Sequence, residues 1–360
     1  MQSKFLIKFL TIFIFLFTVS SFAQHEKVEG EGEKAEAKAG IKEAVYHHIQ
    51  DSHEFIFFHN SETGKYYGFS LPVILWDNGL HIFSASKFHH GEKIVESNGN
   101  YYKLYHNKIY KTNASGDLKL NEHGHPENEK PLDFSITKNV FMIIVIGILM
   151  LLLFGGLAKS FEKGYIATGV GRFFEPIILF IRDEIAIPNI GEKHYKKYMP
   201  FLLTVFFFIW FSNLFGLTPL SVNITGNITI TLALALITFI ITQFSGNKNY
   251  WKHIFWMPGV PWPMKIVLAP IELIGVFIKP FALMIRLYAN IMAGHVVLMS
   301  IIGLIFIFKN WVGGSLTFLL AFVLSILELL VALLQAYIFT MLSALYFGFA
   351  VEEHEHEEAH

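Results

Sequence analysis

Several uninterrupted runs of about 20 apolar residues limit most strongly how this chain can fold. A run of that length matches the hydrocarbon thickness of a bilayer, where every backbone polar group needs a partner within the protein. A helix meets that need inside one segment. The sequence therefore predicts an all-α integral membrane domain over residues 135–351, with about five transmembrane helices and one interfacial helix.

The composition supports a membrane protein and argues against other classes. Hydrophobic residues make up 53% of the chain and charged residues 16%. The formal net charge of −1 offers nothing that would attract nucleic acid. The chain has no cysteine, which excludes disulfides and cysteine-ligated metals.

Basic residues indicate the orientation of the spans. The first three are expected at residues 136–157, 199–217 and 228–244. Lys and Arg are frequent in 158–198 and again after the third span, which marks both segments as cytoplasmic. Within the first of them, residues 173–187 mix apolar and charged side chains and are expected to lie along the membrane interface.

The apolar stretch 264–308 allows two interpretations. As one straight helix it would be roughly 65 Å long, about twice the hydrocarbon core of the bilayer. It is either two spans joined by a loop near Arg286, or one long helix that is strongly tilted or bent. Residues 281–293 contain no Gly or Pro to form a loop, so we favour the long helix. Pro270 and Pro280 would bend this helix rather than end it.

The two ends of the chain differ from the membrane domain. Residues 1–23 have the pattern of a secretory signal peptide, with an additional transmembrane helix as the alternative. Residues 24–134 form a polar region that we expect in the periplasm, disordered at its start and part-β further on. A last long helix, antiparallel to the one before it, is expected at 315–349 and leads to an acidic cytoplasmic tail at 352–360.

Short strands and histidine pairs mark the polar region. Strands are expected at residues 66–76 and 99–110, with a turn at Asn78–Gly79. The pairs His47–His48 and His89–His90 could bind a metal or lie at the surface. They lack a regular ligand spacing, so we predict no metal site.

The last two helices carry polar residues that a bilayer would normally exclude. Arg286 cannot lose its charge, and burying it in hydrocarbon costs a few kcal/mol, so it indicates a function. At helical spacing Glu272, Lys279 and Asn290 share one stripe with Arg286, while His295 lies on the opposite face. The other polar positions on the last helix are Glu328 and Gln335, seven residues apart and on one face.

Each of these residues also has a structural explanation. Lys279 could extend to the membrane surface, and Glu272 could simply pair with Lys265 or Lys279. The partner of Arg286 could be Glu328 or an acid on another chain. The cluster as a whole is harder to explain structurally than any one member.

The segment Leu283-Met-Ile-Arg-Leu-Tyr-Ala-Asn-Ile-Met-Ala-Gly-His295 resembles the signature of subunit a of the F-type ATP synthases. That signature is Arg-Leu-(Phe/Tyr)-(Gly/Ala)-Asn, followed by Ala-Gly and then Glu or His. Further family-like segments are Leu202 to Pro219, Thr231 to Ala235 and Leu334 to Leu342. The resemblance covers about residues 136–352 and leaves 24–134 unexplained.

The resemblance implies a role for each polar residue. Arg286 would be the stator arginine that faces the rotating ring of c subunits, with Asn290 and Gln335 as its polar neighbours. Glu272 would belong to one aqueous half-channel. His295 and Glu328 would form an acid–imidazole pair whose two residue types are exchanged relative to many members.

The sequence departs from the family at two positions, because Gly216 and Asn227 stand where Asp is common. The resemblance also implies partners and a location. The partners would be the c-ring, the b subunits of the peripheral stalk, the lipid bilayer and, indirectly, the F1 sector. No cofactor is implied, and the location would be a bacterial inner membrane.

The implied function is ion translocation coupled to ATP synthesis, with a proton as the first expectation and Na⁺ as the alternative. Two other classes are an ion-coupled secondary transporter and a membrane scaffold. The chain shows none of the internal repeats common in transporters, and a scaffold would not need a buried arginine. No G-x-x-x-x-G-K-[ST] loop is present, so nucleotide chemistry would belong to partner subunits.

Overall fold

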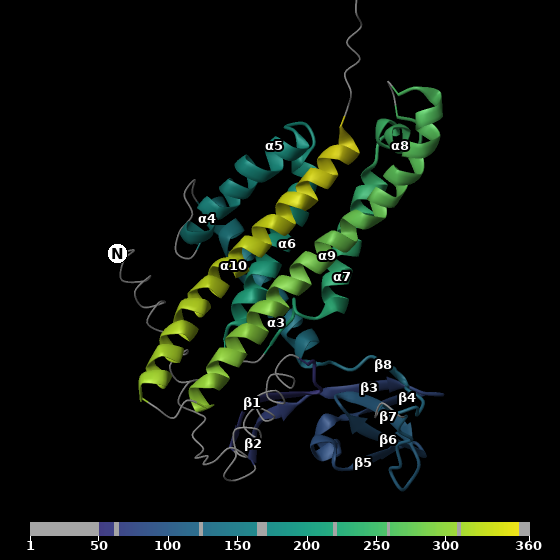
Figure 1. Cartoon of the computed structure of the whole chain (residues 1–360), viewed down its shortest axis with the longest axis vertical. Helices are drawn as coiled ribbons and strands as arrows, with labels where there is room; N and C mark the ends of the chain where they lie inside the picture. The colour runs from purple at the N-terminus through teal and green to yellow at the C-terminus, as the bar shows by residue number, and fades with distance from the viewer. Residues whose placement is uncertain are drawn as a thin grey trace, which may run out of the picture. The chain divides into compact units, whose positions relative to one another are not determined.

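A computed structural model describes residues 50–60, 65–121, 125–163, 171–218, 222–257, 260–307 and 311–352 (Figure 1). The expected signal peptide, the His47–His48 pair and nearly all of the acidic tail lie outside these residues. The chain divides into two compact units. The first comprises Met1–Val145 and Phe215–Asn223, and the second Ile146–Leu214 and Ile224–His360.

The first unit contains three small antiparallel sheets. A hairpin of β1 (Glu54–Asn60) and β2 (Lys65–Ser70) has an irregularity between Ile56 and Phe58. The second sheet has the order β4-β3-β8 and the third the order β5-β6-β7. Their strands are β3 (Pro72–Trp76), β4 (Leu80–Ser84), β8 (Leu132–Asp133), β5 (Ile94–Ser97), β6 (Asn100–Tyr105) and β7 (Lys108–Thr112).

Tight turns explain why these strands pair with their neighbours in sequence. Asn98 and Gly99 link β5 to β6 with φ values of 51° and 81°, and His106 and Asn107 link β6 to β7 with 46° and 60°. Two successive positive φ values are typical of the turns whose twist suits a hairpin. The predicted turn at Asn78–Gly79 joins β3 to β4.

The core of the first unit follows from alternation along the strands. Val73, Leu75 and Phe83 are buried and belong to one apolar cluster with Tyr102 and Ile109 of the third sheet. A short 3-10 segment, η1 (Ala85–Gly91), adds Phe88 to this cluster. In the second sheet, β3 and β4 each bury alternate residues, which leaves their other face outside the core.

Five helices among the described residues are long and apolar enough to cross a membrane. They are α3 (Lys138–Lys163), α6 (Tyr195–Gly216), α7 (Ile228–Ser245), α9 (Trp262–Ile307) and α10 (Trp311–Val351). The shorter helices are α4 (Gly171–Phe180), the π-helical η2 (Ile181–Ala186), α5 (Ile187–Ile190) and α8 (Lys248–Phe255). The chain is thus a predominantly helical membrane protein, as predicted.

The long-helix interpretation of residues 264–308 is confirmed, because α9 is continuous over 46 residues with Pro270 and Pro280 inside it. At about 1.5 Å per residue, α9 is far longer than a bilayer is thick. The last helix begins earlier than predicted, because α10 starts at Trp311 and not at residue 315. The helix includes Gly313 and Gly314, although glycine has a low helix propensity, because the surrounding apolar sequence favours the helix.

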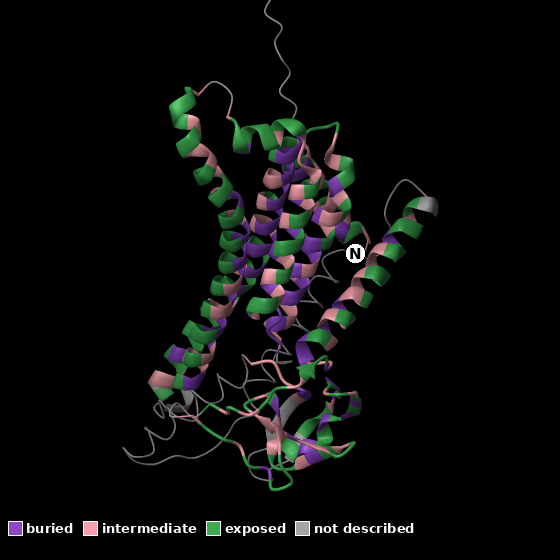
Figure 2. Cartoon of the chain, turned by 90° about the vertical axis from the view of Figure 1, so that its right-hand side faces the viewer, coloured by how far each residue is buried: buried purple, intermediate pink, exposed green. Residues whose placement is uncertain are grey.

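Burial differs sharply among the membrane helices (Figure 2). In the most apolar 18-residue stretch of α6, 50% of the residues are buried. The corresponding shares are 17% in α3 and 11% in α9. Phe207 of α6 packs against Phe154 of α3 and Phe174 of α4, with ring centroids 4.7 and 5.7 Å apart. α6 is therefore central to its unit, while α9 presents most of its surface outward.

Candidate functional site

Arg286 lies on the outward surface of α9. Its side chain is exposed, and so are the neighbouring large apolar side chains of Phe281 and Ile285. Among the described residues, Arg286 makes no ion pair, although it interacts electrostatically with Tyr346 of α10. A guanidinium among apolar side chains of a membrane helix is costly without a counter-charge, and no described residue forms an ion pair with it.

The predicted stripe around Arg286 is only partly exposed. Asn290 is exposed, whereas Glu272 and Lys279 are half-buried. The Lys279 amine lies 5.7 Å from the ring centroids of both Tyr346 and Phe349, which is the distance of a cation–π contact.

The explanation of Glu272 as the ion-pair partner of a lysine is wrong for the part of the chain that the structure describes. Lys279 contacts aromatic rings instead, and Lys265 lies over the ring of Trp256, 4.6 Å from its centroid. The apolar surroundings favour these aromatic contacts because a ring face attracts a cation without a second desolvated charge.

His295 and Glu328 meet in the interior, on the side of α9 away from Arg286. The imidazole Nδ1 lies 3.1 Å from Glu328 Oε1, and the two side chains are only 5% and 7% exposed. Among the described residues, neither carboxyl oxygen of Glu328 accepts a hydrogen bond, although both are buried. Glu328 therefore pairs with His295 and not with Arg286.

Gly294 makes room for this contact. A Cβ atom at position 294 would lie 3.2 Å from Glu328 Oε1, which is tighter than ordinary van der Waals contact. At Gly275, on the same helix, an added Cβ would meet nothing within 4 Å. The absence of a side chain at 294 thus matters for the position of the Glu328 carboxyl.

α9 and α10 run antiparallel, as the contacts along them require. Lys279 meets Tyr346 and Phe349, while His295, further along α9, meets the earlier residue Glu328 of α10 (Figure 1). Arg286 lies between these two contacts in the sequence of α9. The helix pair thus presents polar groups on both sides of the arginine.

α6 adds a polar contact that the sequence patterns did not reveal. The amide of Asn213 donates to the Ala332 carbonyl of α10 at 3.2 Å, and its oxygen accepts from Thr225 at 2.5 Å. Ala332 lies between Glu328 and Gln335, and all three are buried on α10. A lone Asn inside an apolar run was the available signal, but nothing in the sequence indicates which helix it reaches.

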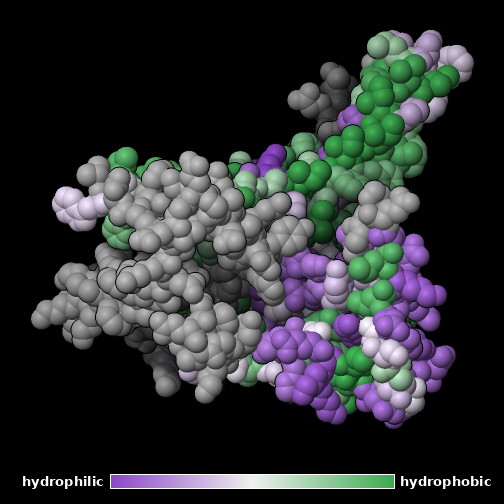
Figure 3. Space-filling view, turned by 60° about the horizontal axis from the view of Figure 1, so that its bottom comes forward, coloured by the Kyte–Doolittle hydropathy of each residue, from purple (hydrophilic) through white to green (hydrophobic). Residues whose placement is uncertain are grey.

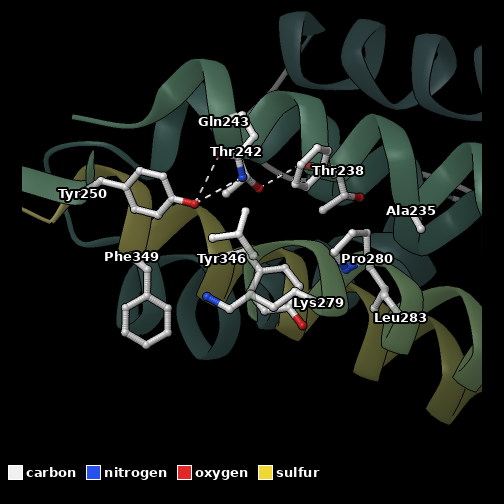
Figure 4. A pocket seen from close by; sticks show the side chains of 12 residues that line it. Ala235, Thr238, Thr242, Gln243, Tyr250, Lys279, Pro280, Leu283, Tyr346 and Phe349 are labelled. Carbon is white, nitrogen blue, oxygen red and sulfur yellow. Dashed lines mark hydrogen bonds between the residues drawn. The ribbon is translucent and has the colours of Figure 1, made fainter. Parts of the chain in front are cut away.

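A pocket lies where α7, α8, α9 and α10 converge (Figure 4). Lys279, Tyr346 and Phe349 line one part of it, and the amide of Gln243 donates to the hydroxyl of Tyr250 at 3.2 Å in another. The turn after α7 also binds the end of α10, because Asn247 donates to the carbonyls of Ala350 and Val351. The pocket therefore lies near the helix ends, toward the N-terminal part of α9 from Arg286.

Comparison with known proteins identifies the family to which this chain belongs. Residues 140–348 match the family described as "ATP synthase A chain". The chain belongs to this family. Every polar residue predicted for the site lies inside the matched segment.

Named relatives agree with this assignment. The chain is 40% identical over 265 residues to "ATP synthase subunit a" of Anaeromyxobacter sp. (strain Fw109-5), covering 71% of this chain and 62% of the relative. It is 44% identical over 237 residues to "ATP synthase subunit a 2" of Chlorobaculum tepidum, covering 63% and 66%. The chain thus spans slightly less than two thirds of the length of these two relatives.

The polar region has relatives of its own. Residues 44–134 match a family described as a domain of unknown function. "ATP synthase subunit a 2" of Prosthecochloris aestuarii is 36% identical over 321 residues, covering 84% of this chain and 98% of the relative. That coverage exceeds the ATP synthase A chain segment, so part of the polar region is shared with this relative.

Proposed function

We propose that this chain is the ion-translocating stator subunit of an F-type ATP synthase, working against a rotating ring of c subunits. The observation that carries the proposal is Arg286, a charged side chain without an ion-pair partner among the described residues, exposed on α9 within the family segment. Its partner would be a carboxyl group of the ring. The b subunits of the peripheral stalk would hold the stator, and the F1 sector would carry the nucleotide chemistry.

Arg286 would act by its permanent charge. A ring carboxyl would be protonated while it faces lipid, and the guanidinium would favour its ionised form as it arrives. The proton would leave on one side of Arg286, and rotation would carry the carboxylate to a proton source on the other. One elementary charge crossing 100 mV supplies about 2.3 kcal/mol for this rotation.

The buried pair would form part of one proton path. His295 and Glu328 can each hold a proton. The buried Gln335 lies seven residues further along α10, and Asn213 of α6 contacts Ala332 between them. No described residue donates a hydrogen bond to the Glu328 carboxyl oxygens, so water entering this path could donate one and exchange a proton. These features support a half-channel on the C-terminal side of Arg286 along α9.

The pocket near Lys279 would form part of the other path. It lies toward the N-terminal end of α9 from Arg286, on the same side as Glu272. Its amide and hydroxyl groups could hold water, which a proton needs to pass. A proton would not pass directly from one path to the other, because the positive charge of the Arg286 guanidinium between them would repel it.

Basic residues support an orientation for the subunit. Lys248, Lys252 and Lys265 lie near the pocket end of the helices, which would therefore face the cytoplasm. The polar region would then lie in the periplasm and the C-terminus in the cytoplasm, in a bacterial inner membrane. The transported ion would be the proton.

ATP-driven proton pumping in inverted membrane vesicles tests the proposal. Arg286→Ala should abolish pumping, while ATP hydrolysis recorded in parallel shows that the complex is assembled. Arg172→Ala is the matched control, since it removes an exposed arginine of α4 outside the five candidate spans. Pumping that survives in Arg286→Ala would refute the stator role.

Arg286→Lys sharpens the same test. Lysine keeps the charge but replaces the broad guanidinium with a compact, strongly hydrated ammonium. We expect at most a trace of coupled ATP synthesis. Near-normal synthesis would mean that charge alone is sufficient at this position.

A further inference from the structure

The outer face of the β4-β3-β8 sheet is apolar. Side chains on this face are Ile74, Trp76, Leu80, Ile82, Leu132 and Phe134. The strand register places them together, because Ile74 lies opposite Ile82, and Trp76 lies opposite both Leu80 and Leu132. Trp76, Ile82 and Phe134 are 54%, 62% and 65% exposed. Register and exposure together make this face a contiguous apolar surface. The side of this region in view in Figure 3 is largely hydrophilic.

This surface is unusual for a small sheet. An antiparallel sheet with one face in the core normally presents polar residues on the other face. Here the outward positions of β3 and β4 carry no charged residue, and Pro72 and Ser84 complete them. Contiguous exposed apolar surfaces of this kind mark interaction sites.

The sheet is joined directly to the first membrane span. Phe134 donates its backbone N–H to Ile74, and Ile136 donates to Pro72, so the chain follows β3 until it enters α3. α3 begins at Lys138, four residues after Phe134. Four extended residues reach at most about 14 Å, so Phe134 lies within that distance of the start of α3.

Aromatic side chains continue from the sheets into the span. The ring of Phe141, in the first turn of α3, contacts those of Phe55 and Phe69, with centroids 5.8 and 5.3 Å apart. The backbone N–H of Lys138 also donates to the Ser52 carbonyl at 2.9 Å. These contacts lie within one compact unit and hold the β strands at the start of the span.

We propose that the outer face of the β4-β3-β8 sheet docks on the lipid bilayer, in the leaflet where α3 begins. The short connection from β8 to α3 keeps the face near that leaflet. Its Trp, Phe, Leu and Ile side chains are of the kinds that enter the interfacial layer favourably. The ligand is a lipid surface, contacted by apolar side chains. This inference needs α3 to span the membrane but does not depend on the proposed ion transport.

Single-cysteine labelling tests this docking, because the natural chain contains no cysteine. Ile82→Cys on β4 and Leu132→Cys on β8 each place one nitroxide label on the face. Glu96→Cys is the matched control, since Glu96 is an exposed position on β5 of the β5-β6-β7 sheet. The full-length protein would be studied in nanodiscs of phosphatidylethanolamine and phosphatidylglycerol.

The measurement is the collision rate of each label with oxygen, which concentrates in lipid, and with a water-soluble nickel chelate. At both face positions we expect more oxygen collisions and fewer nickel collisions than at position 96. Labels as accessible to nickel as the control would overturn the proposal. Labels shielded from both reagents would also overturn it, because a protein surface, such as a second copy, would then cover the face. Agreement between the two positions guards against misfolding of either variant.

Discussion

Buried carboxyl groups have different surroundings in the β strands and in the membrane helices. Asp77, at the turn between β3 and β4, accepts hydrogen bonds from Lys111 at 2.7 Å and from the buried Tyr102 hydroxyl at 3.0 Å. Glu328, between α9 and α10, has an imidazole 3.1 Å away but no hydrogen bond to either oxygen. Two side chains thus fix the Asp77 carboxylate by hydrogen bonds, whereas no described residue does so for the Glu328 carboxyl.

The hydroxyl groups of the membrane helices show that this is not a general property of the bilayer region. Thr238, Thr242 and Thr340 each donate to the carbonyl four residues earlier, so their polar atoms are satisfied within their own helix. Among the described residues, the buried side-chain atoms of the membrane helices that lack a hydrogen bond are the Asn139 amide oxygen, the hydroxyls of Tyr198 and Ser212, and both carboxyl oxygens of Glu328. Glu328 is the one acid in this set, and a buried acid without hydrogen bonds is costly enough to suggest a function.

Exchanging His295 and Glu328 should have the largest effect, and it tests whether the buried Glu328 carboxyl serves function rather than stability. His295→Glu places two acids together, and Glu328→His places two imidazoles together. Removing one partner of a buried pair typically costs about 3–5 kcal/mol, so each single variant should lose most of its proton pumping. The double variant His295→Glu with Glu328→His restores an acid–imidazole contact and should recover pumping. A double variant no better than the singles would show that the residues do not act together.

Adding a methyl group beside Glu328 should have a smaller effect. Gly294→Ala would press against the carboxyl, 3.2 Å from the new Cβ, and should reduce pumping without abolishing it. Gly275→Ala is the control on the same helix, where the methyl group enters open space. In a helix Gly→Ala is normally stabilising by about 1 kcal/mol. Equal pumping in the two variants would mean that the position of the Glu328 carboxyl is unimportant.

Tyr102→Phe should have the smallest effect and test the paired acid. The hydrogen bond from Lys111, with a further one from Tyr102, lowers the pKa of Asp77 below its ordinary 3.8, although burial opposes this. A lowered pKa stabilises the folded state above about pH 3.8, and that contribution is lost as the pH falls below this value.

We therefore expect Tyr102→Phe to cost about 1–2 kcal/mol at pH 7 and progressively less in acid. Hydrogen exchange of peptides from β3 to β7 in the full-length protein measures this loss. Tyr101→Phe is the control, because no described hydrogen bond involves the Tyr101 hydroxyl. If Tyr102→Phe lowers stability by the same amount at every pH, the Tyr102 hydroxyl does not stabilise the ionised form of Asp77.

The membrane helices could be predicted well because their signals are local. Apolar length identified the spans, and the absence of Gly and Pro near Arg286 identified α9 as one helix. Helical spacing placed Arg286 and His295 on opposite sides of α9, and in the structure one is exposed and the other buried. Each inference uses only residues within a few turns of one another.

The contacts between helices could not be predicted in the same way. The sequence left open whether Glu328 meets Arg286 or another group, and whether Glu272 pairs with a lysine. Periodicity tells which residues share a face of one helix, but not how that helix is rotated or shifted against its neighbours. For this reason the role of Asn213 at Ala332 and the aromatic contacts of Lys279 emerged only from the packing.

The sequence by itself determined a helical membrane protein with an arginine within a long apolar helix, and its motif indicated the ATP synthase A chain family. Tertiary structure alone decided that His295 meets Glu328 beside Gly294, and that an apolar sheet face lies next to the first span. The physical reason is the range of the interactions. Bilayer length and helical period act along the chain, whereas a buried pair or a sheet face depends on residues brought together from distant segments.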